Sequence, residues 1–449
     1  MTSSPETSPA AAAASSHQPI VIPRSEHPIS RKQFCDRALK VLYRLHESGY
    51  QAYLVGGGIR DLLLGKHPKD FDVATDATPE EVRKLFRRAR IIGRRFKIVH
   101  VMFGRDYTEV ATFRALHQPE SEHEDVQSDS EGRIVRDNRY GTLEEDAFRR
   151  DFTVNALYYN IADFSIVDYM GGYQDILDRR LRIIGDPDQR YREDPVRMLR
   201  AARFTAKLLF SVDAATAEPI RRLGGLLEAI PAARLFDEIV KLFLTGHGER
   251  SLLALETFHL TDHLFPRSIL DGIRADSVLV RRGLASTDDR VRADKPVTPF
   301  FLFAVLLWPA VQRRADRLHR GGMPPAAAMQ RASAEVAGEL QSRIAIPRRF
   351  STPMSEIFRL QARFERTKGK RSMALLDHPR FRAAYDFMLL RTAAGEFDQE
   401  LADFWTRVQD EMPPQAPGDD IPEEDDLGPP DSQPRRRRRR RRRKPAGAS

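Results

Sequence analysis

The chain has 449 residues and a formal net charge of +9 at pH 7, from 73 Lys+Arg against 64 Asp+Glu. Its hydrophobic content of 41% fits a soluble globular protein, and no apolar run approaches the roughly 18 residues that span a bilayer, which excludes an integral membrane protein. Cys35 is the single cysteine, so an intramolecular disulfide framework and a multi-cysteine zinc site are excluded.

The positive charge is concentrated near the C-terminus. Without one run of ten residues the chain has 63 basic against 64 acidic side chains, so the rest is close to neutral. Residues 413–449 are Pro-rich, then acidic, then basic, and we expect them to be disordered. We predict that the basic run neutralises the phosphates of a nucleic acid. It consists of Arg435, Arg436, Arg437, Arg438, Arg439, Arg440, Arg441, Arg442, Arg443 and Lys444.

The first 30 residues are rich in Ser, Ala and Pro and have little to bury, which predicts a disordered segment. They carry no basic residue before the alanine run and no leucine-rich stretch, so they make a poor signal peptide. We therefore expect a reducing, cytoplasmic setting.

Regular patterning begins at Arg31. Apolar residues recur at helical spacing over 34–45 and stop at Gly49, which predicts a helix. A short buried strand is expected over 53–55, followed by a triple-glycine turn at 56–58 and a second helix.

The segment DFDVAT alternates acidic with apolar residues, as a strand with one polar face does. Thr78, Pro79 and Glu81 then form a helix start with a capping box. Residues 97–103 and 107–113 predict two more strands.

An acidic stretch over 118–137 predicts a mobile loop. Helix is expected over 144–160, and strands over 164–172 and 181–185. Beyond Asp186 the pattern is one of successive amphipathic helices. The sequence thus predicts an α/β or α+β unit followed by an all-helical unit, with the boundary near residue 186.

The glycine turn and the strand after it predict a phosphate and metal site. Backbone amides at a glycine turn can bind an anion, and Asp70 and Asp72 share one face of their strand. Two such carboxylates suit two Mg²⁺ ions that hold a triphosphate. A dinucleotide fingerprint is excluded because Asp61 stands where it needs glycine. The bland alternative is a tight turn beside an acidic strand edge.

A third carboxylate would complete a two-metal site. Glu109 qualifies, because it points away from its apolar strand neighbours, although it could also be an ordinary exposed residue. Asp151 competes for this role, with Arg150 beside it, and on a helix it would share a face with Asn155.

The helix that opens at Asp194 places Arg197 and Arg200 at three-residue steps. A carboxylate and a guanidinium held side by side can present donors and acceptors to a base. An N-cap with two solvated arginines is the alternative. Arg234 and Glu238, four residues apart, fit a helix-stabilising pair equally well.

Three motifs in this order, GGGIRD with DFDV, RRDFTVNAL and EDPVRMLRAARF, resemble the class II nucleotidyltransferases, which comprise CCA-adding tRNA enzymes and bacterial poly(A) polymerases. The runs GRRFKIVHVMFG and DHPRFRAAYDFMLLR and the arginine-rich end are similar to the poly(A) polymerase I branch. The resemblance covers about residues 31–391.

The resemblance implies an α+β fold, with a small mixed-sheet nucleotidyltransferase head followed by an all-helical neck, body and tail and disordered termini. The expected divisions are a head over 31–185, a neck over 186–250 and a body over 251–412. The implied catalytic residues are Asp70, Asp72 and Asp151, and the implied metal ligands are Asp70, Asp72 and Glu109. The implied nucleotide-binding residues are Gly56, Gly57, Arg60, Asp61, Arg150, Asn155, Asp194, Arg197 and Arg200.

In CCA-adding enzymes the motif matched by Asp194 and Arg197 reads the incoming base, and poly(A) polymerases are thought to hold that pair differently. Arg234 and Glu238 match a later motif that supports this helix.

The implied activity is template-independent transfer of AMP from ATP to RNA 3′ ends with release of pyrophosphate, using two Mg²⁺ ions. The implied partners are messenger RNAs and small structured RNAs, together with proteins of RNA decay. The enzyme itself is expected to be a monomer. A CCA-adding enzyme is the alternative within the family. An RNA-binding protein with an inactive head is the alternative from another class.

Overall fold

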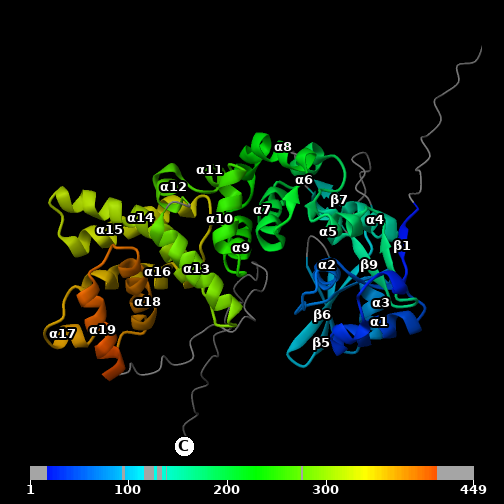
Figure 1. The fold of residues 1–449 in the computed structure, drawn as a ribbon, viewed down its shortest axis with the longest axis horizontal. Helices are drawn as coiled ribbons and strands as arrows, with labels where there is room; N and C mark the ends of the chain where they lie inside the picture. Colours follow the sequence, from blue (N-terminus) through cyan, green and yellow to red (C-terminus); the bar gives the residue numbers. More distant parts are fainter. Residues whose placement is uncertain are drawn as a thin grey trace, which may run out of the picture. The chain divides into compact units, whose positions relative to one another are not determined.

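The computed structural model describes residues 18–93, 97–115, 126–128, 134–137, 139–274 and 277–411. All of these residues belong to one compact unit. Within it a mixed α and β region precedes a series of helices, as the colours of Figure 1 show. This confirms the α+β class expected from the sequence. The finer divisions near residues 186 and 250 stay predictions.

The first region, here called the head, contains all but one of the strands in the described residues. Its elements are β1 (Ile20–Ile22), η1 (Arg24–Glu26), η2 (Arg31–Gln33), α1 (Asp36–Glu47), β2 (Ala52–Val55), α2 (Gly57–Leu63), β3 (Asp72–Thr75), α3 (Pro79–Leu85), β4 (Ala89–Ile92), β5 (Ile98–Phe103), β6 (Asp106–Thr112), β7 (Val126–Ser128), β8 (Ile134–Asp137), α4 (Leu143–Arg149), η3 (Thr153–Asn155), β9 (Leu157–Asn160), β10 (Ile166–Asp168), α5 (Gly172–Leu177) and β11 (Arg180–Leu181).

Eight of these strands form one sheet in the order β1-β10-β9-β2-β3-β6-β5-β4. Neighbouring strands of this sheet are antiparallel except β3 and β6, which run parallel with Val73 opposite Val110. The parallel pair needs a crossover, and α3 with β4 and β5 supplies it. The acidic strand therefore lies at the centre of the sheet, between the glycine-turn strand β2 and β6.

Helices cover the two faces of the sheet unequally. Val41 of α1 and Val82 of α3 belong to the same buried cluster as Val73 and Val110, so these helices pack on one face (Figure 1). On the other face, α4 packs against β2 and β9 in a separate cluster that includes Ala147. The capping boxes of Thr78 with Glu81 and of Thr142 with Glu145 fix the starts of α3 and α4.

The expected helix over 144–160 is wrong beyond Arg149. Helix α4 ends there, a 3₁₀ turn follows at η3, and β9 begins at Leu157. The Asp151 carboxylate accepts the N–H of Phe152 at 2.8 Å, which offers the backbone an alternative to the helical hydrogen bond. Phe152 also forms an antiparallel bridge with Ile183. Local competition and a long-range partner thus override the helical pattern.

Two segments expected to lack structure contain strands. The prediction for residues 1–30 is wrong over 18–30, because Ile22 is buried and β1 pairs with β10 at the edge of the sheet. Within the acidic stretch 118–137, β7 and β8 form an antiparallel hairpin, so the loop prediction is wrong for those strands. Residues 1–17 and the other residues of the stretch lie outside the described ranges.

The helical region begins at Pro187. Its elements are α6 (Pro187–Glu193), α7 (Val196–Leu208), β12 (Ser211–Val212), α8 (Ala214–Leu223), η4 (Gly224–Ala229), α9 (Ala232–Phe243), α10 (Gly248–Thr257), α11 (Thr261–Leu264), α12 (Arg267–Ile273), α13 (Val278–Arg292), α14 (Pro299–Arg320), α15 (Pro325–Gln341), α16 (Arg348–Phe364), α17 (Lys370–Met373), α18 (Phe381–Ala393) and α19 (Gln399–Glu411). Strand β12 pairs in parallel with β11 and so links this region to the head. Among the described helices, none has the length and apolarity to cross a membrane.

Candidate active site

The glycine turn between β2 and α2 needs glycine at its first position. Gly56 has φ 76° and ψ −137°, a conformation that residues with a side chain rarely adopt. A Cβ on Gly56 would lie 3.6 Å from Nη1 of Arg150, and one on Gly57 would lie 3.2 Å from Nη2 of Arg60. The turn therefore lies against two guanidinium groups. The Gly56 N–H donates to the Leu157 carbonyl, so the candidate donor to an anion is the N–H of Gly57 at the start of α2.

Arg60 is buried and fixed by the head and by α7. It donates to Asp61 Oδ1 from Nε at 2.8 Å and from Nη2 at 2.6 Å, and to Asn155 Oδ1 from Nη1 at 2.5 Å. Lys207 donates to the other oxygen of Asp61 at 3.0 Å. Burial by itself would raise the pKa of Asp61, but the charges of Arg60 and Lys207 outweigh it and hold the pKa below its ordinary value. Asp61 is therefore an ionised anchor.

Arg150 is a half-buried cation whose charge acts on Asp72. Its Nε donates to the Tyr158 hydroxyl at 2.8 Å and its Nη2 to Asp146 Oδ2 at 2.9 Å, while the Tyr158 hydroxyl donates to the same carboxylate at 2.7 Å. The pKa of Arg150 is raised because the attraction of Tyr158 and Asp146 outweighs burial. Burial raises the pKa of Asp72, and the nearby charge of Arg150 offsets part of this rise.

Asp151 joins the head to α7. Its Oδ1 accepts from the Phe152 N–H at 2.8 Å and from Asn155 Nδ2 at 3.0 Å, and its Oδ2 accepts from Arg200 Nε at 2.6 Å. Burial would raise the pKa of Asp151, but Arg200 and these hydrogen bonds lower it to about 2. Asp151 and Asn155 do meet as expected, across a turn rather than along a helix.

Two of the three predicted metal ligands, Asp72 and Glu109, lie on neighbouring strands of the sheet, and Asp70 lies just before the first of these strands. Because Val73 pairs with Val110, the preceding residues Asp72 and Glu109 are neighbours on the opposite face. Asp72 is open at the start of β3, and Asp70 precedes it in the exposed loop. Burial and then the charge of Asp72 raise the pKa of Glu109 to about 7. Burial raises the pKa of Asp72. The charge of Arg150 lowers it in part, and the charge of Asp70 adds to the rise.

This donor set suits a hard divalent cation. It offers carboxylate oxygens whose mutual repulsion a cation would relieve. As the side chains stand, no three acidic, His or Cys residues of the described part of the chain are close enough together to enclose an ion. Binding would therefore draw Asp70, Asp72 and Glu109 together, with oxygen atoms of the substrate in the remaining positions.

Glu109→Gln should lose most of the stabilisation that a divalent cation gives. For the wild type at pH 8, Mg²⁺ at ten times its Kd should stabilise the fold by about 1.4 kcal/mol. Because the pKa of Glu109 is raised, its contribution to stability falls as pH rises from its unfolded value through about 7. The variant should therefore be at least as stable as the wild type at pH 8 without metal. Thermal unfolding of both proteins with and without MgCl₂ measures both effects. If Mg²⁺ stabilised Glu109→Gln as much as the wild type, Glu109 would not be a metal ligand.

The expected pairing of Asp194 with Arg197 does not form. Arg234 donates to Asp194 Oδ2 at 2.7 Å, and Arg197 donates to Glu193 Oε2 at 2.9 Å. The reason is geometric: Asp194 lies before α7 in extended backbone, so its carboxylate faces α9 rather than the next turn of its own helix. The expected pair of Arg234 with Glu238 is likewise absent, since Glu238 accepts from Lys241 at 2.9 Å.

Sequence reasoning missed Arg203 and Lys207 on α7. With Arg200 they recur at three- and four-residue steps, so the helical period could have placed all three on one face. Arg60, Arg200 and Arg203 surround the ring of Phe204 within 5.5 Å of its centroid. Burial lowers the pKa of Arg203. With Arg150, these side chains place five cations around the carboxylates of the site.

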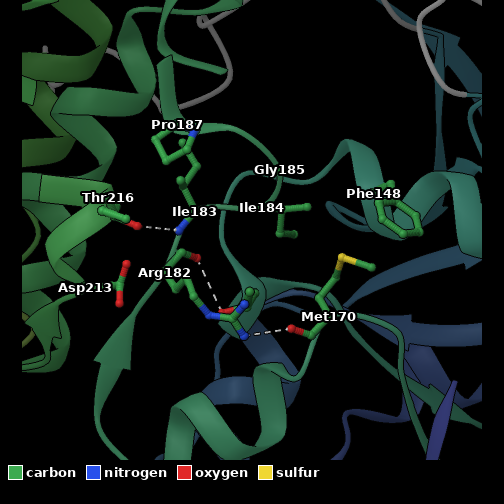
Figure 2. A pocket seen from close by; sticks show the side chains of 11 residues that line it. Phe148, Met170, Arg182, Ile183, Ile184, Gly185, Pro187, Asp213 and Thr216 are labelled. Carbon is green, nitrogen blue, oxygen red and sulfur yellow. Dashed lines mark hydrogen bonds between the residues drawn. The ribbon is translucent and has the colours of Figure 1, made fainter. Parts of the chain in front are cut away.

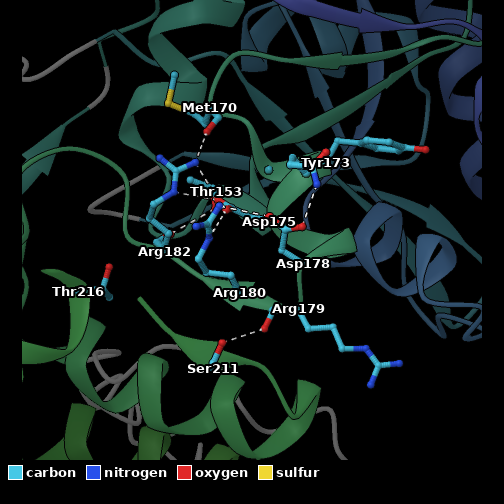
Figure 3. A network of polar contacts seen from close by, with 12 residues as sticks. Thr153, Met170, Tyr173, Asp175, Asp178, Arg179, Arg180, Arg182, Ser211 and Thr216 are labelled. Atoms are coloured by element: carbon cyan, nitrogen blue, oxygen red, sulfur yellow. Dashed lines mark hydrogen bonds and ion pairs between the residues drawn. The ribbon is translucent and has the colours of Figure 1, made fainter. Parts of the chain in front are cut away.

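A second buried network holds the Asp151–Asn155 segment in place. Asp175 is completely buried and accepts from the Thr153 hydroxyl at 2.7 Å, from Arg182 Nε at 2.9 Å and from Arg180 Nε at 2.9 Å. Figure 3 shows both arginines converging on it. A Cβ on Gly172 would lie 2.1 Å from the Thr153 carbonyl oxygen, so α5 packs directly against the turn. Neither interaction was expected from the sequence.

A cavity of about 210 Å³ lies beside this network, apart from the carboxylates. Figure 2 shows Phe148, Met170 and Ile184 around it, and the Ile183 N–H donating to Thr216 across the boundary with α8. It contains none of the predicted site residues. The predicted RNA-binding run Arg435–Lys444 lies outside the described ranges.

Known proteins match the whole of this arrangement. The family models "Poly A polymerase head domain", "Probable RNA and SrmB- binding site of polymerase A" and "Polymerase A arginine-rich C-terminus" match residues 52–182, 209–268 and 321–444. Poly(A) polymerase I of Salmonella typhimurium is 48% identical over 406 residues, which is 89% of this chain and 87% of that protein. The chain belongs to the poly(A) polymerase I family. It is a polynucleotide adenylyltransferase, a nucleotidyltransferase whose family uses a nucleotide substrate and a divalent metal.

Other members and neighbours agree with this assignment. Poly(A) polymerase I of Haemophilus influenzae is 43% identical over 396 residues, covering 87% of this chain and 88% of that one. The CCA-adding enzyme of Bacillus pumilus is more distant, at 38% over 250 residues, or 53% and 60% of the two chains. The crystal structure of the Bacillus stearothermophilus CCA-adding enzyme with CTP has a TM-score of 0.57 at 25% identity and covers 86% of this chain and 84% of that one.

Proposed function

We propose that this poly(A) polymerase family member transfers AMP from ATP to the 3′-hydroxyl of RNA and releases pyrophosphate, with Asp70, Asp72 and Glu109 as its acidic centre. The observation that carries the proposal is the order of groups across the sheet. The glycine turn and fixed Arg150 lie on one side of Asp72, and Glu109 lies on the other.

The chain's own residues bind and orient the substrate. The N–H of Gly57 at the start of α2 and the guanidinium of Arg150 would bind the β- and γ-phosphates, because they present a donor and positive charge beside the glycine turn. Asp151 with Arg200 fixes α7 against this site. Two Mg²⁺ ions held by the carboxylates would neutralise charge on the phosphates and favour ionisation of the RNA hydroxyl. Positioning and charge neutralisation supply most of the rate.

Asp194 and Arg197 have partners already, so we propose that they shape the base site rather than pair with adenine directly. Arg234 and Glu193 would hold them as a rigid frame. We propose that the enzyme is a monomer and acts in the cytoplasm. Its substrates would be messenger RNAs and small structured RNAs, and proteins of RNA decay would be its partners.

The decisive experiment incubates the protein with an unstructured RNA and either ATP or CTP. Long ladders with ATP alone are expected. A CCA-adding enzyme would leave this RNA unextended and would add three nucleotides to a tRNA that lacks its CCA end. ATP-dependent release of pyrophosphate would exclude an inactive RNA-binding head.

Removing residues 434–449 should weaken RNA binding and flatten its salt dependence. Ten basic residues can each neutralise a phosphate of a single strand, and each contributes a slope of about −0.7 to log K against log salt. AMP transfer at saturating RNA should persist. Filter binding of one RNA at several salt concentrations, with the full chain as control, measures the slope. An equal slope in the two proteins would contradict a role for the run in RNA binding.

A further inference from the structure

One face of the sheet next to the carboxylates is left uncovered by the helices that the structure describes. On β6 the residues Thr108 and Val110 are buried, whereas Tyr107 and Glu109 alternate with them and point to the other side. The same alternation on β5 buries Val101 and leaves His100 on the open side. Helices α1 and α3 pack on the buried side. In the described residues no helix forms an extended contact with the open side of β4, β5 and β6.

The pairing of β6 with β5 and of β5 with β4 places chemically distinct groups in a row on that face. Glu109 pairs with His100, and His100 pairs with Arg90. Directly paired residues point to the same side of a sheet, and neighbouring strands lie about 4.8 Å apart. The row therefore runs from Asp72 through Glu109 and His100 to Arg90, and its far end lies about 10 Å from Glu109.

The groups at the far end suit a nucleotide of a single strand. The rings of His100 and Tyr107 stack with their centroids 3.9 Å apart and 12° between their planes, and Tyr107 is 50% exposed. Arg90 is exposed, and its side chain has no hydrogen bond or ion pair with any residue that the structure describes. A fixed aromatic platform with a free cation beside it is how proteins bind single-stranded nucleic acid.

The direction of the reaction indicates which substrate belongs there. Attacking and leaving oxygens lie in line on opposite sides of the transferred phosphorus. The glycine turn and Arg150, proposed above to bind the leaving pyrophosphate, adjoin β2, on one side of Asp72. The attacking hydroxyl must then approach from the other side, which is that of β6, β5 and β4.

We propose that Tyr107, His100 and Arg90 form the binding site for the 3′-terminal nucleotides of the RNA, with a base stacked on Tyr107 and a phosphate bound by Arg90. The inference rests on the proposed function, since it assigns the second substrate of the same reaction. It predicts sequence-tolerant binding, because every base has a face that can stack.

The first test measures AMP transfer to a short oligoadenylate, so that contacts with more distant regions contribute little. Tyr107→Ala should raise the KM for the oligonucleotide about tenfold, since stacking contributes about 1–3 kcal/mol per base. The KM for ATP should stay within about twofold. Tyr107→Phe should behave as the wild type because it keeps the ring. Arg90→Ala should raise the same KM and reduce its salt slope by about 0.7.

Arg83→Ala is the matched control, because Arg83 is an exposed arginine on α3, which covers the other face. An unchanged KM for the oligonucleotide in both Tyr107→Ala and Arg90→Ala, or an effect on ATP instead, would overturn the inference. A wild-type protein that fails to extend saturating RNA would overturn the proposed function as well, so the two failures are distinguishable.

A second test needs no variant and therefore does not depend on folding of one. An RNA with 4-thiouridine at its 3′ end, photo-crosslinked to the wild-type protein, should label the tryptic peptide of residues 106–114, which contains Tyr107. Labelling confined to the helical region would place the RNA end elsewhere.

Discussion

Asp72→Asn should reduce AMP transfer about a thousandfold and leave the fold intact. The substitution keeps the shape of the side chain but removes the charge that, with Glu109, would bind the cations and stabilise the transferred phosphate. Asp72 is open to solvent, so its replacement costs little packing. It should even stabilise the metal-free protein slightly, because the repulsion with Asp70 and Glu109 disappears. Pyrophosphate release and RNA extension under ATP measure the loss.

Asp76→Asn provides the control from the other end of the same strand. Its carboxylate is exposed and caps the N–H of Gln51 at 2.8 Å, far from the glycine turn. This variant should keep near wild-type activity. Asp70→Asn should behave like Asp72→Asn. Near wild-type transfer by purified Asp72→Asn would show that the catalytic carboxylates lie elsewhere.

Asp151→Ala should lower the free energy of unfolding by about 3 kcal/mol at pH 7 and abolish most activity. It leaves Arg200 without its buried partner, and breaking such a pair costs about 3–5 kcal/mol. The loss of Asp151 also frees Asn155, which positions Arg60. Urea unfolding and AMP transfer measure the two consequences separately.

The pH dependence distinguishes this carboxylate from others. The pKa of Asp151 is lowered to about 2, so its stabilisation is complete above its ordinary pKa and is lost as pH falls through about 2. That stabilisation is about 2 kcal/mol by linkage, and the difference between wild type and Asp151→Asn should shrink over this range. Asp188→Asn, which removes an exposed ion pair with Arg222, should change stability little at any pH. Equal effects of the two variants would contradict the buried role of Asp151.

The carboxylates of the site were predictable because they obey local rules. Alternation in DFDVAT and in the strand of Glu109 predicted acids on the polar face of each strand. Both strands form, although β3 begins at Asp72, so that Asp70 lies in the preceding loop rather than in the expected strand. The glycine turn was also predictable from a local rule, because the backbone conformation at Gly56 requires glycine whatever residues surround it.

Partners drawn from distant parts of the chain were not predictable. Asp194 lies three residues from Arg197, yet its carboxylate accepts from Arg234, 40 residues away. The turn at Asp151 replaces an expected helix because Phe152 pairs with Ile183, a residue on the far side of β10 and α5 in the chain. Helical spacing ranks nearby pairs equally, and only the packing of α7 against the head and α9 selects among them.

The sequence by itself determined that the chain outside its arginine-rich run is nearly neutral and that a mixed α and β region precedes a helical one. It also placed Asp72 and Glu109 on the polar sides of their own strands. These properties depend on composition and on the two-residue period of a strand. The tertiary structure decided that β3 lies between β2 and β6, which sets the glycine turn on one side of the acids and the stacked Tyr107 on the other. Strand order depends on which edges meet when the core is buried, and no local pattern encodes that choice.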